Sequence, residues 1–242
     1  MRESAPARPC QPPSAQAPCG RMTPPSPAPL RTPIPPLPGI VWGLILLCLL
    51  PELVLQGADH GLWGSARWRP LAYQNGAFWA GLLYGWRPNY AAQPWVMFLS
   101  YAWLHAGAAH LAGNLGALLW LGPQVAARRG AAGLILIWLA AVLGGGVAFG
   151  VLATTPAPMV GASGAVFGLA ADWLVAEVRA ARGTRARMLR AAALVAFLVA
   201  INIAAWALQG GQLAWETHLG GFLAGAGLVL VWPRRKSERA AP

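Results

Sequence analysis

The sequence AAGLILIWLAAVLGGGVAFGVLA, residues 131–153, contains no charged side chain. At about 1.5 Å of rise per residue, a helix of this length spans the roughly 30 Å of hydrocarbon in a lipid bilayer. Five further apolar runs accompany it, at about 40–56, 97–122, 161–178, 191–208 and 217–232, several of them short. We therefore predict an all-α membrane protein with six transmembrane helices.

The composition excludes several other classes of protein. Of the 242 residues, 57% are hydrophobic and only 10% are charged, against about 25% charged in an ordinary soluble domain. So few charges argue against a soluble globular enzyme and against a disordered chain. The net charge of +11 does not indicate nucleic-acid binding, because a basic patch needs a polar face. Cys10, Cys19 and Cys48 are too few and too poorly placed for a disulfide framework.

The basic residues predict the orientation in the membrane. With six spans, both termini lie on one side, and only Arg67, Arg69 and Arg87 of the 18 Lys and Arg residues lie on the other. Positive residues accumulate on the cytoplasmic side, so both termini are expected in the cytoplasm. The short loops favour a bacterial inner membrane. The sequence leaves the oligomeric state open.

Three segments follow from these patterns. Residues 1–38 are dense in Pro, Ala and Ser and are expected to form a disordered cytoplasmic tail, with Met22 a candidate alternative start. Residues 39–233 form the six-span domain, and residues 234–242 form a basic cytoplasmic tail. The long 57–96 connection is rich in Trp and Tyr and is expected to fold in the outer interface, although an ordinary aromatic belt explains its composition equally well.

Polar residues inside a bilayer are costly, so each is a candidate site residue. The candidates are Glu52, His105, His110, Asn114, Ser163, Asp172, Glu177, Asn202, Glu216, Thr217 and His218. Asp172 lies nine residues after Ser163, which places it on the opposite helix face and about 13 Å deeper. We therefore expect it to pair with loop arginines rather than with Ser163.

Ser163 follows a segment that cannot be helical. Pro156 and Pro158 interrupt any helix before it, so a helix is expected to begin near Gly161 with Ser163 in its first turn. Free backbone N–H groups and the positive end of the helix dipole suit a developing oxyanion there. Ser163 is thus a candidate nucleophile; an ordinary serine N-cap is the alternative.

A serine nucleophile needs a base, and His218 begins the sixth span at a similar depth. Gly221 and Gly225 follow it as a stripe of small residues that allows another helix to approach closely. The fourth span carries its own small residues, Gly161, Gly164 and Gly168. Two such faces would bring Ser163 and His218 within reach of each other, although plain helix packing explains the glycines equally well.

The second span supplies further polar groups. His110 and Asn114 are four residues apart and share a helix face, so they are candidate donors to an oxyanion or a polar pair that joins helices. His105 is about 140° from His110 on a helix and is expected to point elsewhere. A zinc site is disfavoured, because the sequence has neither His-Glu-x-x-His nor an i, i+4 histidine pair.

These motifs resemble those of the rhomboid intramembrane serine proteases. The matching motifs are His110-x-x-x-Asn114, Gly161-Ala162-Ser163-Gly164 and His218-x-x-Gly221-x-x-x-Gly225, in the expected order over about residues 40–232. His105 fits the His-rich entry to the second helix. One departure is Pro94-Trp95-Val96, which lacks the Arg that members often carry after this Trp.

The resemblance implies a six-helix bundle with a short central fourth helix and a Ser163–His218 dyad without an acidic third member. It implies that His110, Asn114 and the Ser163 amide bind the oxyanion and that Phe167 packs against His218. The implied substrates are single-span membrane proteins within the lipid bilayer, cleaved without a metal or cofactor. A rhomboid-like non-catalytic protein that binds membrane clients is the alternative, but such relatives usually lack the Ser or the His. A transporter would predict internal repeats, and none is evident.

Overall fold

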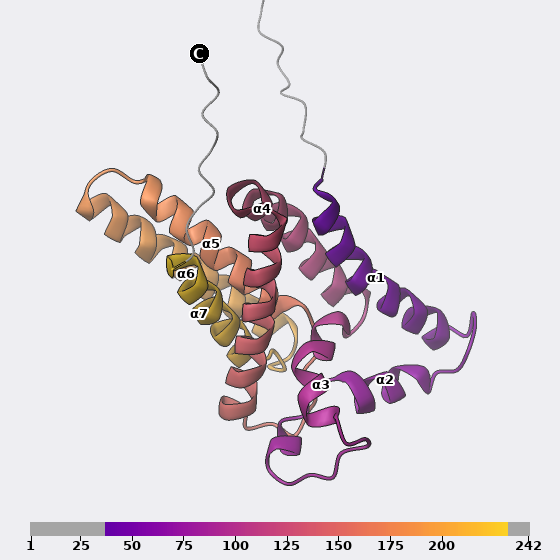
Figure 1. Cartoon of the computed structure of the whole chain (residues 1–242). Coiled ribbons are helices and arrows are strands. Elements are labelled where there is room, and N and C mark those ends of the chain that lie inside the picture. The colour runs from indigo at the N-terminus through magenta and orange to yellow at the C-terminus, as the bar shows by residue number, and fades with distance from the viewer. Residues whose placement is uncertain (1–36, 232–242) are drawn as a thin grey trace, which may run out of the picture. The chain divides into compact units, whose positions relative to one another are not determined.

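The computed structural model describes residues 37–231 of the chain. The expected tails at 1–38 and 234–242, with Met22, therefore lie almost entirely outside the described residues. Within them the secondary structure is helical, with β pairing confined to an isolated bridge between Phe78 and Met159, so the all-α class is confirmed. The elements are α1 (Gly39–Asp59), α2 (Trp68–Gly76), η1 (Ala80–Leu83), α3 (Gln93–Ser100), η2 (Tyr101–Trp103), α4 (Ala108–Leu152), α5 (Ser163–Ala180), α6 (Thr184–Leu208) and α7 (Trp215–Val231) (Figure 1).

The long helix α4 consists of two arms. Gly130 has a non-helical backbone with φ of 74°, a conformation that glycine adopts without steric cost. The arms match two of the predicted spans, except that the first begins at Ala108 and not near residue 97. The residues before it, which were expected to belong to the same helix, form α3, η2 and a short loop instead. Gly107 also has positive φ, which interrupts a continuous helix.

Among the described residues 37–231, three helices are long and apolar enough to cross a membrane: α1, α4 and α6. Helix α5 has 18 residues but includes Asp172, Glu177 and Arg179, and α7 is described over 17 residues, up to the last described position. The count of six spans therefore stays a prediction, since it requires both arms of α4 and the helices α5 and α7 to cross.

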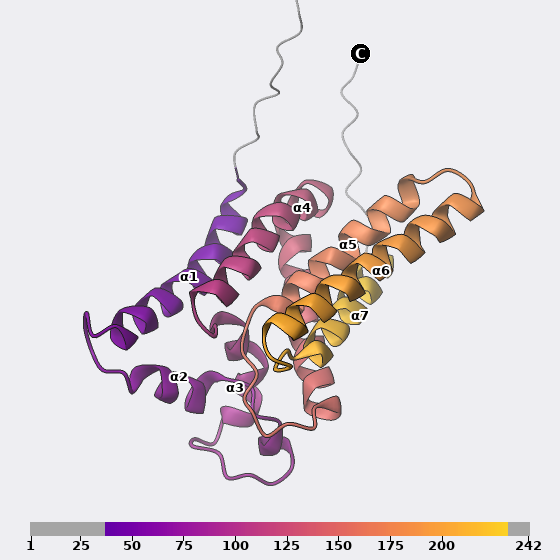
Figure 2. The same ribbon diagram turned by 180° about the vertical axis from the view of Figure 1, so that it is seen from behind.

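The centre of the fold is the packing of α4, α5 and α7 on one another. Helix α5 buries eight of its residues, including Gly164 and Gly168. In contrast, α6 has no buried residue and lies along α5 on the outside (Figure 2). This arrangement makes α5 the central helix. Its first residue follows directly on the loop segment 153–162.

The connection between α1 and α4 is folded, as predicted. It contains α2, η1 and α3, and the Phe78 backbone pairs with Met159 through two hydrogen bonds of 2.9 Å. Figure 1 shows α2 and α3 at one end of the molecule, whereas the turn of α4, the start of α1 and the α5–α6 connection lie at the opposite end. The folded connection thus braces the loop that leads into α5.

Candidate active site

Ser163 is the first residue of α5, and Ala162 is the N-cap. The helix begins near Gly161 with Ser163 in its first turn, as predicted, and Gly161 itself, with φ of +124°, lies in the loop before it. No side-chain hydrogen bond caps this terminus, so the ordinary role of a serine as N-cap does not apply. The Gly161 amide donates to the carbonyl of Tyr101 at 3.0 Å, which fixes the loop immediately before Ser163.

His110 and Asn114 lie against this loop. A Cβ built on Gly161 would be 2.7 Å from His110 Cε1, 2.8 Å from His110 Nε2 and 3.7 Å from Asn114 Nδ2. The Ala106 amide donates to His110 Nδ1 at 3.3 Å, so the ring proton resides on Nε2. Two side-chain N–H donors from α4 therefore lie beside the backbone two residues before Ser163, where the first amides of α5 are also available.

His218 lies in the first turn of α7 and is buried. Its ring stacks on Phe167 of α5, with ring centroids 4.3 Å apart and an angle of 8° between the planes. Phe167 follows Ser163 by one helical turn, about 40° around the axis, so His218 faces the side of α5 that carries Ser163. Among the described residues no hydrogen bond joins the two side chains.

The Nδ1 atom of His218 lies 2.5 Å from Oδ1 of Asn202 on α6. An amide oxygen only accepts hydrogen bonds, so Nδ1 carries the proton and Nε2 keeps its lone pair. The sequence identified Asn202 only as a polar residue in an apolar span. No spacing rule links residues 202 and 218, because the two helices approach each other only in the folded chain.

The sequence model of the Rhomboid domain family matches residues 92–235. This is more than half of the chain, and it includes all of the candidate site residues described above. The chain belongs to the rhomboid family. It is 32% identical over 178 residues to RHOMBOID-like protein 2 of Arabidopsis thaliana, covering 69% of this chain and 47% of that protein. It is also 32% identical over 163 residues to human Rhomboid-related protein 3, covering 63% of this chain and 40% of that protein.

The matched region spans less than half the length of each of these curated relatives. Together with the apolar helices, membership of the rhomboid family makes this chain an integral membrane protein. Within residues 37–231 the rhomboid fold brings together no group of three or more His, Cys, Asp or Glu side chains that could hold a metal ion.

Glycines set the distance between α5 and α7 in this rhomboid fold. A Cβ on Gly225 would lie 2.6 Å from the Cα of Gly168, and one on Gly164 would lie 2.7 Å from Cγ2 of Thr217. A Cβ on Gly221 would lie closer still to the carbonyl oxygen of Gly164. The two small-residue faces predicted from the sequence therefore meet, and they bring the start of α7 to the start of α5.

His105 does not point away from His110, contrary to the sequence-based expectation. Their rings meet edge to face with centroids 5.4 Å apart. The expectation assumed a continuous helix, but residues 104–107 are not helical, so the angular rule does not apply there. His105 is completely buried and forms part of the wall behind His110.

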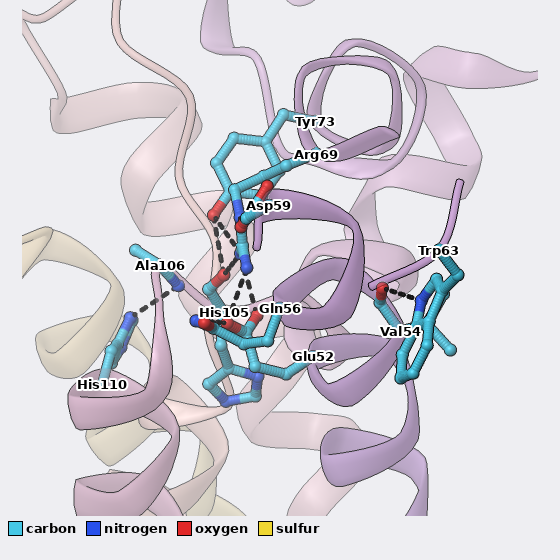
Figure 3. A network of polar contacts seen from close by, with 10 residues as sticks. All are labelled: Glu52, Val54, Gln56, Asp59, Trp63, Arg69, Tyr73, His105, Ala106 and His110. Carbon is cyan, nitrogen blue, oxygen red and sulfur yellow. Dashed lines mark hydrogen bonds and ion pairs between the residues drawn. The ribbon is translucent and has the colours of Figure 1, made fainter. Parts of the chain in front are cut away.

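A polar network outside the site fixes the segment that precedes α4 in the sequence (Figure 3). Arg69 of α2 donates to both carboxylate oxygens of Glu52 at 2.8 and 3.0 Å and to Asp59 at 2.6 Å. It also donates to the carbonyl of His105 at 2.9 Å, and the Tyr73 hydroxyl donates to the same carbonyl at 2.7 Å. The sequence signal that we missed was the rarity of these charges, since Arg69 is one of only three basic residues expected on this side.

The network also affects the protonation of its members. The hydrogen bond to Glu52 raises the pKa of Arg69 above its ordinary value, so this side chain is cationic at any working pH. Burial raises the pKa of Tyr73, which keeps its hydroxyl as a donor. The His105 carbonyl, in the segment that leads to His110, therefore accepts hydrogen bonds from a permanently cationic Arg69 and a neutral Tyr73.

A cavity of about 310 Å³ lies beside His218. Its wall is formed by α6, α7 and one residue of α5, and it is almost entirely apolar apart from two side chains. The lining residues are Phe167, Val195, Leu198, Val199, Asn202, Trp215, His218, Leu219, Phe222 and Leu223. An apolar chain segment, rather than a charged one, suits such a cavity.

Proposed function

We propose that this protein is an intramembrane serine endopeptidase in which Ser163 is the nucleophile and His218 the general base. The observation that carries the proposal is the convergence of three helices at the start of α5. His218 of α7 stacks one turn beyond Ser163, and His110 and Asn114 of α4 lie against Gly161. A nucleophile, a base with an available lone pair and oxyanion donors are the three parts that acyl transfer requires.

In the proposed reaction, Nε2 of His218 takes the proton of Ser163 as the hydroxyl oxygen bonds to the substrate carbonyl carbon. The Ser163 amide, His110 and Asn114 stabilise the negative oxygen of the tetrahedral intermediate. His218 then gives its proton to the leaving nitrogen as the C–N bond breaks, which leaves an acyl-enzyme. Water adds to this ester by the same steps, and the serine recovers its proton from His218.

We infer that the protein crosses the membrane six times with both termini in the cytoplasm. The support is the charge distribution, since Arg67, Arg69 and Arg87 alone among 18 basic residues would lie on the outer side. The site then lies near the outer membrane face. A bacterial inner membrane is proposed from the short loops alone, and fractionation of source cells tests it.

The proposed substrates are single-span membrane proteins. A peptide bond inside a helix is shielded by its own hydrogen bonds, so the substrate helix must unwind locally before Ser163 reaches the carbonyl. Small or helix-breaking residues near the outer membrane face make such unwinding easier. The proposed reaction requires no metal and no cofactor.

A non-catalytic rhomboid-like protein that binds membrane clients is the second candidate. It is favoured by one observation, that no hydrogen bond joins Ser163 to His218 among the described residues. The experiment that separates the two is incubation of the purified protein in proteoliposomes with a single-span model substrate. Ser163→Ala and His218→Ala should abolish cleavage, whereas the exposed control His60→Ala should retain it.

Two results would contradict the protease proposal. Equal cleavage by the native protein and both dyad variants would show that the dyad is wrong. Binding of the substrate by all variants, with no cleavage by any, would favour the client-binding protein instead.

A further inference from the structure

Asn202 is the one strongly polar side chain in the apolar stretch 191–208 of α6. A polar side chain in such a helix is costly and is retained where it has a partner. Its partner here is Nδ1 of His218, 2.5 Å from Oδ1. Since α6 has no buried residue at all, general packing of this helix does not explain why an amide occupies the position.

The hydrogen bond and the stacking contact constrain the His218 ring in different ways. Phe167 lies parallel to one face of the imidazole, which limits its tilt. The amide oxygen of Asn202 accepts from Nδ1 and so determines both the rotation of the ring and the tautomer. With the proton held on Nδ1, the lone pair is on Nε2, the nitrogen that must accept the serine proton.

We propose that Asn202 is a positioning residue for His218, so that the site is a Ser163–His218–Asn202 arrangement with its third member on α6. This inference rests on the proposed protease function and goes beyond the dyad. An amide is chemically adequate, since Cys-His-Asn proteases use an asparagine in the same role. The oxygen also stabilises the imidazolium that forms when Ser163 transfers its proton.

Several other ionisable groups lie on the elements around His218. His110 lies on α4, Glu216 on α7 itself, and Tyr101 of η2 lies near Thr217. On α5, Asp172 is paired with Arg128 and Arg129 toward the opposite end of the helix. The arginines of α6 lie in its first seven residues, more than two turns before Asn202. None of these groups is altered in the variants below.

The test compares Asn202→Leu, Asn202→Asp and the control Leu198→Ala, which lies one turn earlier on α6 and lines the same cavity. Three quantities are measured across pH: kcat and KM for a single-span substrate, and the rate at which a fluorophosphonate probe labels Ser163. Asn202→Leu removes the acceptor and should lower kcat and the labelling rate by about tenfold or more, with little change in KM.

Asn202→Asp keeps an acceptor oxygen and adds a negative charge beside the imidazolium. It should retain most of the activity, and the acidic limb of its pH profile should move up by about one unit. Leu198→Ala should keep the native pH profile. A native kcat and pH profile in Asn202→Leu would overturn the inference, as would a pH shift in Leu198→Ala equal to that in Asn202→Asp.

Two further outcomes are distinguishable. If Asn202→Leu fails to fold, as judged by circular dichroism, the pH profile of Asn202→Asp decides: a shift supports the positioning role and an unshifted profile overturns it. If Ser163→Ala cleaves as well as the native protein, the proposed protease function itself has failed. If Ser163→Ala is inactive and Asn202→Leu is fully active, only the role of Asn202 is wrong.

Discussion

Two positions on helix α5, its first residue Ser163 and Asp172 halfway along it, place their polar side chains in opposite environments. Asp172 is 1% exposed and accepts hydrogen bonds from Arg128 at 2.8 Å and Arg129 at 2.7 Å. At the first residue, Ser163 is partly buried and makes no hydrogen bond through its side chain to another described residue. A buried polar group with all its partners stabilises the fold, whereas one held near donors and a base without being bonded to them is available for chemistry.

The largest expected effect concerns the Ser163 end. Ser163→Ala should reduce cleavage and fluorophosphonate labelling to background, while the temperature of unfolding stays unchanged because the hydroxyl has no structural partner. Cleavage of a single-span substrate and thermal unfolding in detergent measure the two quantities. The exposed serine variant Ser65→Ala, which loses only a hydrogen bond from the Arg67 amide, should retain cleavage. A clear loss of stability in Ser163→Ala would show that Ser163, like Asp172, stabilises the fold.

The next prediction concerns the close approach of helices α5 and α7. Gly225→Val should abolish cleavage and lower the free energy of unfolding by about 1–3 kcal/mol, because the new side chain meets the backbone of Gly168. The matched control is Gly227→Val on the same helix, where an added Cβ meets nothing within 4 Å. Equal activity of the two variants would show that the close approach of the helices is not required.

Substitution of Asp172 should change the stability of the fold and leave the chemistry unchanged. Asp172→Asn removes the negative charge that accepts from the buried Arg129 and the partly exposed Arg128, and it should lower the free energy of unfolding by about 3–5 kcal/mol. The specific activity of the folded fraction should remain close to native. Denaturant unfolding and cleavage by the folded fraction measure these effects. The surface pair Glu177–Arg190, 3.4 Å apart, is the control, and Glu177→Gln should cost less than about 1 kcal/mol.

A drop in the activity of Asp172→Asn as deep as that of Ser163→Ala would contradict the assignment of Asp172 to structure alone. It would show that Asp172 contributes to catalysis at Ser163 as well as to the stability of the fold.

The smallest expected effect concerns the network around the Ser163 end. Burial raises the pKa of Tyr73, so the folded state favours the neutral phenol. This contribution to stability is fully present below the pKa of an unfolded tyrosine, about 10, and is lost as the pH rises through the higher folded value. Tyr73→Phe should remove this alkaline loss, as measured by denaturant unfolding between pH 8 and about pH 11. An unchanged slope in Tyr73→Phe would show that Tyr73 is not the group responsible.

Much of the candidate site was predictable because its residues are rare. Few polar side chains occur in the apolar spans, so Ser163, His218, His110 and Asn114 stand out, and their family motifs place them in order. The pairing of Asp172 with loop arginines was also predicted, from the helical angle, and the ion pairs confirm it. Rarity identifies candidates of this kind without any knowledge of which helices touch.

The errors occurred where a local rule was applied outside its conditions. The orientation of His105 was derived from helical angles, but α4 begins only after Gly107, so His105 does not belong to the helix. The second span was expected from about residue 97, but its arm of α4 begins only at Ala108, after the same glycine. Asn202 was noted but assigned no partner, because a contact between α6 and α7 depends on how the two helices pack and not on a repeat along either of them.

The sequence by itself determined that the chain is a helical membrane protein of the rhomboid family, and which few residues could perform chemistry in it. Apolar runs, charge distribution and motif order are properties of the chain and need no fold to be read. Only the tertiary structure decided that His218 stacks on Phe167 and bonds to Asn202, and that His110 and Asn114 lie against Gly161. The physical reason is that these contacts depend on the close approach of separate helices, set by glycines whose effect appears only when a second backbone occupies the space a side chain would fill.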